Sequence, residues 1–87
     1  MPIKEDKYRE WLALNSGLSQ KGQNDLVSRL RRGDKLVPIN MNTSFDSYAL
    51  ALSQHSTWRS IPATSQQSIL AAAKKYILWS QLADNIN

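Results

Sequence analysis

The sequence predicts an all-α fold, a compact bundle of four main helices joined by short loops. Four segments carry apolar residues three or four positions apart, which is the spacing of one helix face. No segment sustains the apolar–polar alternation of a strand, and no Asn-Gly or Asp-Gly hairpin signal occurs. With 87 residues, 41% of them hydrophobic, we expect one domain over residues 1–87.

The first predicted helix covers about residues 4–15. Tyr8, Trp11 and Leu12 share one of its faces. Gly17 follows, and a glycine at this position favours the left-handed conformation that ends many helices. A tight turn to the next helix is therefore expected.

The second predicted helix runs from about Gln20 to Arg32, with Ser19 as its N-cap and Gly33 as its stop. The alternative is a longer helix that continues to Val37, since the breaker Pro38 comes next. The apolar face of this helix comprises Leu26, Val27 and Leu30.

Two further helices follow a loop at residues 38–42. Thr43 or Ser44 is expected to cap the third helix, which ends near His55. A connector over residues 56–63 turns Trp58 and Ile61 inward. Thr64 or Ser65 then caps a long last helix over about residues 65–83. Its buried arc is expected to comprise Ile69, Leu70, Ala73, Tyr76, Ile77 and Ser80.

The supply of catalytic side chains is small. The chain has no cysteine and one histidine, His55, for which we expect a surface or C-terminal capping role. Neither a P-loop nor a dinucleotide fingerprint is present, and the serines lack a base to activate them. We therefore expect no enzymatic activity, no cofactor and no metal site.

Membrane insertion and secretion are not indicated. The longest dense apolar stretch, residues 69–79, contains two lysines and is too short to span a bilayer. Residues 1–10 are charged rather than apolar, so no secretory signal is visible. The expectation is a cytoplasmic protein that does not contact membranes.

The positive charge is concentrated in the second helix. The net charge of the chain is +4, and residues 19–37 hold five basic residues against two acidic ones. A helical projection places a basic, polar set of side chains opposite the apolar face. This predicted nucleic-acid-binding face comprises Lys21, Asn24, Ser28, Arg31, Arg32 and Lys35. Such a set suits phosphates, although charged helix faces often serve solubility alone.

Side chains around this face extend the hypothesis. Asp25 lies just outside the face and is expected to pair with Arg29 one turn on. Lys74 and Lys75 of the last helix are expected to assist in phosphate binding.

A separate apolar patch is predicted on the last helix. Leu78 and Leu82 are one turn apart on the side away from the buried arc, with Trp79 at its edge. Such a patch predicts a protein interface with a second copy or a partner protein. The alternative is that N-terminal residues, including Ile3, fold across it.

Two stretches resemble a known family. Residues 8–12 (Tyr-Arg-Glu-Trp-Leu), the Gly-Leu-Ser turn at 17–19 and the basic run at 28–32 are similar to the start of the core-binding domain of tyrosine recombinases and phage integrases. Residues 64–79 resemble the last helix of that domain. In that family the second helix opens with the motif Ser-x-x-Thr. This chain has Ser19 at the first position of the motif and Gly22 in place of the threonine.

The resemblance implies a SAM-like helical bundle that clamps duplex DNA and presents two helices to it. The catalytic domain of that family, with its nucleophilic tyrosine, would follow the core-binding domain, and this chain ends at Asn87. The prediction is thus a module that binds double-stranded DNA without catalysis. The alternative is a small protein-interaction or dimerisation module of a phage or mobile element.

Overall fold

The computed structural model describes residues 4–39 and 44–86, with side chains through Leu82. Within these ranges the chain forms four α-helices and one short 3₁₀ helix, and no strand. This confirms the predicted all-α bundle. The elements are α1 (Glu5–Asn15), α2 (Gln20–Leu36), α3 (Phe45–Gln54), η1 (Ser56–Ser60) and α4 (Ala63–Ile86).

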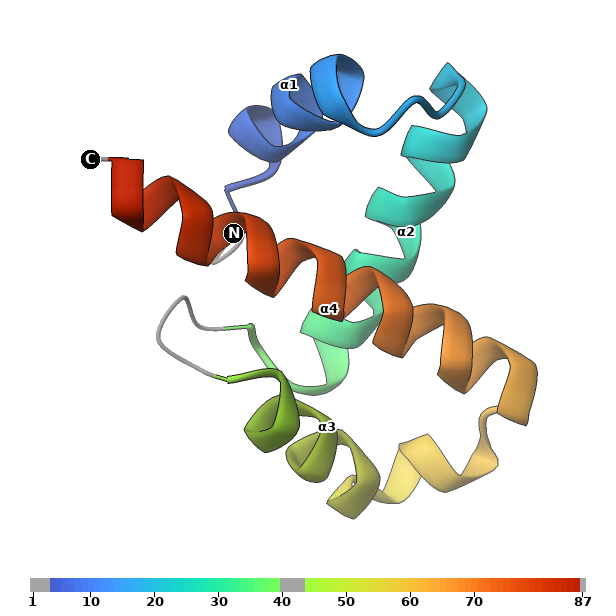
Figure 1. The fold of residues 1–87 in the computed structure, drawn as a ribbon. Helices are drawn as coiled ribbons and strands as arrows, with labels where there is room; N and C mark the ends of the chain where they lie inside the picture. Colours follow the sequence, from blue (N-terminus) through green and yellow to red (C-terminus); the bar gives the residue numbers. More distant parts are fainter. Residues whose placement is uncertain (1–3, 40–43, 87) are drawn as a thin grey trace.

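The long helix α4 is the centre of the fold. It crosses α2, with which it makes its most extensive contact, and it has α1 on one side and α3 on the other (Figure 1). Most of the predicted arc of α4 is buried, and Leu70 is partly buried against it. The buried core gathers apolar residues from every element, including Leu12, Val27, Leu30, Leu52, Trp58 and Ile69.

The turn between α1 and α2 has the predicted form. Gly17 has a φ of 70°, the left-handed conformation that a side chain would disfavour. Ser19 is the N-cap of α2, and its hydroxyl accepts a hydrogen bond from the Gly22 amide at 3.2 Å. Gly22 therefore does not prevent the helix from starting at Gln20.

The end of α2 differs from the leading prediction. The helix does not stop at Gly33 but continues to Leu36, as in the alternative. Gly33 is a buried helical residue, and a Cβ there would lie 3.0 Å from the Tyr48 hydroxyl and 3.1 Å from Cγ2 of Ile69. This glycine allows close packing of α2 against α3 and α4 instead of ending the helix.

The middle of the chain follows the predicted order. Of the two candidate caps of α3, Ser44 accepts a hydrogen bond from the Ser47 amide, and Thr43 lies outside the described residues. His55 ends α3 and caps η1, because its Nδ1 accepts from the Thr57 amide at 3.1 Å. His55 thus occupies the C-terminal position of α3, but its side chain caps the start of η1 and not the end of α3, unlike the expected C-terminal cap.

The start of α4 also differs from the prediction. The helix begins at Ala63, so Thr64 and Ser65 lie in its first turn instead of capping it. The reason is Pro62, whose carbonyl accepts the first helical hydrogen bond, from the Gln66 amide at 3.0 Å. The helix ends at Ile86, three residues beyond the predicted end.

An aromatic cluster joins α1 to α4. Tyr8 is 5.1 Å from Tyr76 and 5.3 Å from Trp79 between ring centroids, and Trp11 stacks on Tyr8 at 6.1 Å. Only 7% of Trp79 is exposed. The expectation that Trp79 contributes to a surface patch is therefore wrong, because α1 covers its indole.

None of the helices in the described part of the chain is long and apolar enough to cross a membrane.

Candidate nucleic-acid interface

The structure divides the predicted basic face of α2 into two parts. The first is an outer ridge that points to solvent, and all its members are exposed. A hollow of about 330 Å³ lies on the ridge, and it is lined by Ser28, Arg32 and Lys35 together with Arg31 and the acidic Asp34. The outer ridge comprises Lys21, Ser28, Arg32 and Lys35.

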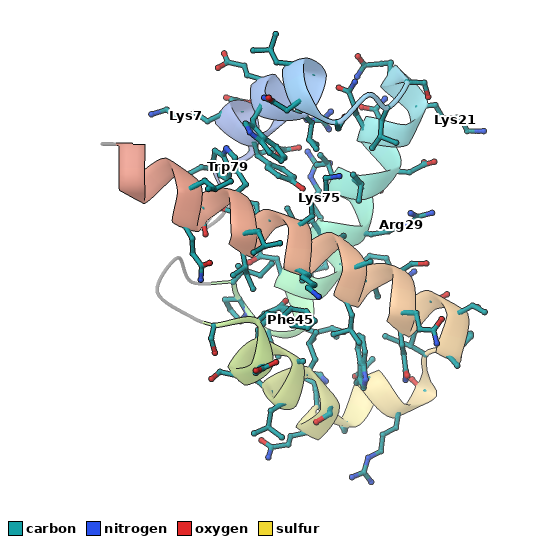
Figure 2. All side chains as sticks on the ribbon, viewed as in Figure 1. Lys7, Lys21, Arg29, Phe45, Lys75 and Trp79 are labelled. Carbon is teal, nitrogen blue, oxygen red and sulfur yellow. The ribbon has the colours of Figure 1, made fainter. Side chains whose placement is uncertain are left out.

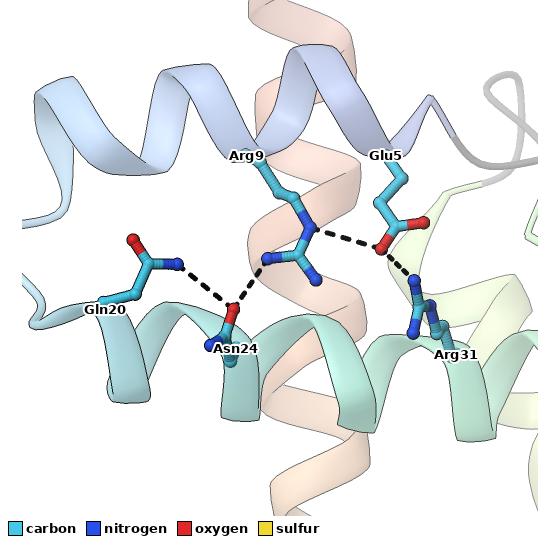
Figure 3. Close-up of polar contacts among 5 residues, drawn as sticks. All are labelled: Glu5, Arg9, Gln20, Asn24 and Arg31. Carbon is cyan, nitrogen blue, oxygen red and sulfur yellow. Dashed lines mark hydrogen bonds and ion pairs between the residues drawn. The ribbon is translucent and has the colours of Figure 1, made fainter.

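The second part of the predicted face lies against α1. Oε1 of Glu5 accepts hydrogen bonds from both Arg31 and Arg9, the latter at 3.2 Å (Figure 3). Nη1 of Arg9 also donates to the Asn24 side chain at 2.7 Å, and Gln20 donates to the same Asn24 oxygen. We call these five residues the α1–α2 seam.

The seam brings a carboxylate from α1 to the basic face of α2. This carboxylate belongs to Glu5, of whose side chain only 12% is exposed. Arg31 and Asn24 therefore help to hold α1 on α2. Arg31 retains 51% side-chain exposure, so it is placed at the border of the outer ridge rather than within it.

The predicted pairing of Asp25 with Arg29 is wrong, since no ion pair joins these two described residues. Arg29 instead lies beside the start of α4. There it lines a hollow of about 180 Å³, together with Arg32, Thr64, Ser65 and Ser68. We call this feature the α2–α4 hollow.

The two lysines of α4 point to different neighbours. Nζ of Lys74 lies 5.7 Å from the ring centre of Phe45, a cation–π contact that directs this lysine toward α3. Lys75 follows Ser68 by two helical turns and thus shares its face of α4. Figure 2 shows Lys75 on the side of α4 toward α1 and α2, so Lys75 is the one better placed to assist α2.

The predicted apolar patch is reduced to two residues. Leu78 and Leu82 are each 52% exposed, as the helical projection predicts. Trp79 is buried under α1, and Ile3 lies outside the described residues.

Known proteins supply no further constraint on the site. Comparisons with protein-family models, curated proteins and solved structures gave no match. The described residues bring together no group of three or more His, Cys, Asp or Glu side chains that could hold a metal ion.

Two parts of the interface are not predicted by the sequence. Glu5 reaches Arg31 from 26 residues away, and helical periodicity carries no signal for that contact. The α2–α4 hollow had a weak signal, because Arg29 and Arg32 are three residues apart and so are Ser65 and Ser68. Nothing in the sequence showed that these two pairs face each other.

Proposed function

We propose that this domain binds the phosphate backbone of double-stranded DNA through the outer ridge of α2, without catalysis. The observation that carries the proposal is the exposure of Lys21, Arg32 and Lys35 on one side of one helix. None of these three forms an ion pair with a described carboxylate. Lys and Arg side chains that neutralise phosphates release the counterions condensed on DNA, which favours binding.

The resemblance to integrase core-binding domains supports the same proposal. It involves residues 8–12 of α1, the turn before α2, the basic run of α2 and residues 64–79 of α4, and the family uses such a domain to hold duplex DNA. Backbone contacts of this type carry little sequence information. Binding is therefore expected to be sensitive to salt and tolerant of sequence.

The test is fluorescence anisotropy of a labelled random-sequence duplex at several salt concentrations. If the ridge cations Lys21, Arg32 and Lys35 and the assisting Lys75 each neutralise one phosphate, the logarithm of affinity falls with the logarithm of salt at a slope of about −3.6. No binding at about 50 mM salt, or a flat salt response, would overturn the proposal.

A pair of matched variants separates the outer ridge from net charge. Lys21→Glu with Lys35→Glu reverses two ridge charges, whereas Lys7→Glu with Arg59→Glu reverses two exposed charges on α1 and η1. The ridge variant should lose at least about tenfold in affinity and bring the slope to about −1.8. The control variant has the same net charge and should retain most of the affinity. Equal losses would show that net charge, not the ridge, determines binding.

A protein-interaction function is the second candidate. Its supporting observation is the exposure of Leu78 and Leu82 one turn apart on α4. The burial of Trp79 removes the residue best suited to be an energetic centre of such an interface. A monomeric mass by light scattering would count against the dimeric form of this function.

A further inference from the structure

The α2–α4 hollow has a composition unlike the rest of the surface. Every residue that lines it is an arginine, a serine or a threonine. Arg29 and Arg32 are three residues apart on α2, which places them side by side on that helix. Thr64, Ser65 and Ser68 come from the first turns of α4.

The packing of the helices fixes the two sides of the hollow relative to each other. Gly33 permits the close contact between α2 and Ile69, one turn beyond Ser65. The start of α4 is held by Gln66, whose Nε2 donates to the Trp58 carbonyl at 2.7 Å. The arginines and hydroxyls are therefore presented by two helices that are anchored in the core.

Electrostatics favour an anion in this hollow. Two arginines line the same small space, and neither forms an ion pair with a carboxylate of the described residues. Like charges in close proximity repel, and a negatively charged phosphate group between the two arginines would replace that repulsion by two attractions. The planar guanidinium fork also matches the geometry of phosphate oxygens.

The hydrogen-bonding groups are consistent with an anion as well. The side chains of Thr64 and Ser65 form no hydrogen bond with another described residue, so their hydroxyls are available as donors. Ser68 differs, because its hydroxyl already donates to the Thr64 carbonyl at 3.0 Å. The first amides of α4 add donors that have no partner within the helix.

We propose that the α2–α4 hollow binds a single phosphate group, and that in the DNA complex this is one phosphate of the backbone. That this phosphate belongs to DNA rests on the proposed function. That the hollow binds a phosphate group does not. A volume of about 180 Å³ is below the range of about 300–1,000 Å³ typical of sites for whole small molecules. The hollow thus fits a phosphate group and not a complete nucleotide.

The first test exchanges arginine and lysine at constant charge. Arg29→Lys keeps the positive charge but removes the two parallel N–H donors with which a guanidinium group binds two phosphate oxygens. The DNA affinity should therefore fall about tenfold. Lys21→Arg, the matched exchange on the outer ridge, should change the affinity less than about twofold. Equal effects of the two exchanges would overturn the phosphate hollow and leave the proposed function standing. As a control, circular dichroism should show the helicity of the original protein in both variants, since Arg29 and Lys21 are exposed.

The second test uses inorganic phosphate alone and does not depend on DNA. In a titration followed by amide NMR, the signals of Ala63, Thr64 and Ser65 should shift saturably. In the Arg29→Gln variant they should not, whereas the Lys21→Gln control should behave as the original protein does. Saturable shifts without any DNA binding would support the hollow and overturn the DNA function. No saturable shift in the original protein would overturn the hollow.

Discussion

The two sides of α2 use the same kind of residue for different purposes. On the side of α1, Arg31 and Arg9 share the carboxylate of Glu5, which is mostly covered. On the side of α4, Arg29 and Arg32 meet hydroxyl groups and no carboxylate. A basic helix face is therefore not one functional surface. Whether an arginine stabilises the fold or remains free for a ligand depends on what the neighbouring helix presents.

The largest effect should come from high pH, which disrupts the core that supports both sides of α2. Burial raises the pKa values of Tyr8, Tyr48 and Tyr76 above their usual value. The folded state therefore retains these phenol protons more tightly than the unfolded state. The stability that this retention gives is complete below pH about 10 and is lost as the pH rises further.

Above pH about 10, each of these tyrosines can lower the free energy of unfolding by up to about 1.4 kcal/mol per pH unit. Urea unfolding between pH 8 and 11, together with tyrosinate absorbance, measures the effect. The Tyr8→Phe variant should lose less stability over the same interval. Tyrosinate formation centred near pH 10 without loss of helicity would contradict the prediction.

The next effect separates the two sides of α2 directly. Arg31→Glu places a second carboxylate beside Glu5 and should lower the free energy of unfolding by about 1–2 kcal/mol. Arg32→Glu, one residue on, should change it by less than about 0.5 kcal/mol because Arg32 is exposed and has no carboxylate partner among the described residues.

Urea denaturation of both variants measures this difference. Combining Arg31→Glu with Glu5→Gln should recover part of the loss, since the repulsion is then removed. Equal stabilities of the Arg31 and Arg32 variants would mean that the seam does not hold α1.

The smallest effect concerns two tyrosine hydroxyls. The Tyr48 hydroxyl donates to the Val37 carbonyl at 2.8 Å, at the end of α2, and Tyr48→Phe should cost about 1 kcal/mol. The buried Tyr8 hydroxyl, beneath α1, has no hydrogen-bond partner among the described residues. Tyr8→Phe should therefore be neutral or stabilising by up to about 1 kcal/mol. Thermal unfolding of the two variants shows whether each substitution raises or lowers the stability. A large loss of stability with Tyr8→Phe would reveal a hydrogen-bond partner for that hydroxyl.

Much of the fold was predictable because its signals are local. The periodicity of the apolar residues marked all four helices, and Ser19 and Gly17 marked the turn between the first two. The errors occurred where a distant contact changes the meaning of a residue. Gly33 has the sequence character of a helix stop, but Tyr48 and Ile69 pack against it and make it a helix interior position. Trp79 lies at the edge of the predicted buried arc, and α1 determines that it is buried.

The candidate site shows the same division. Residue type and helix geometry are enough to predict that α2 is basic, that its apolar and polar faces are opposite, and that Leu78 and Leu82 are exposed. Contacts between helices, which local geometry does not contain, pair Arg31 with Glu5 and bring Arg29 and Arg32 beside the hydroxyls of α4. The physical reason is that charge pairing depends on distances between separate helices, and these are set by how the core packs.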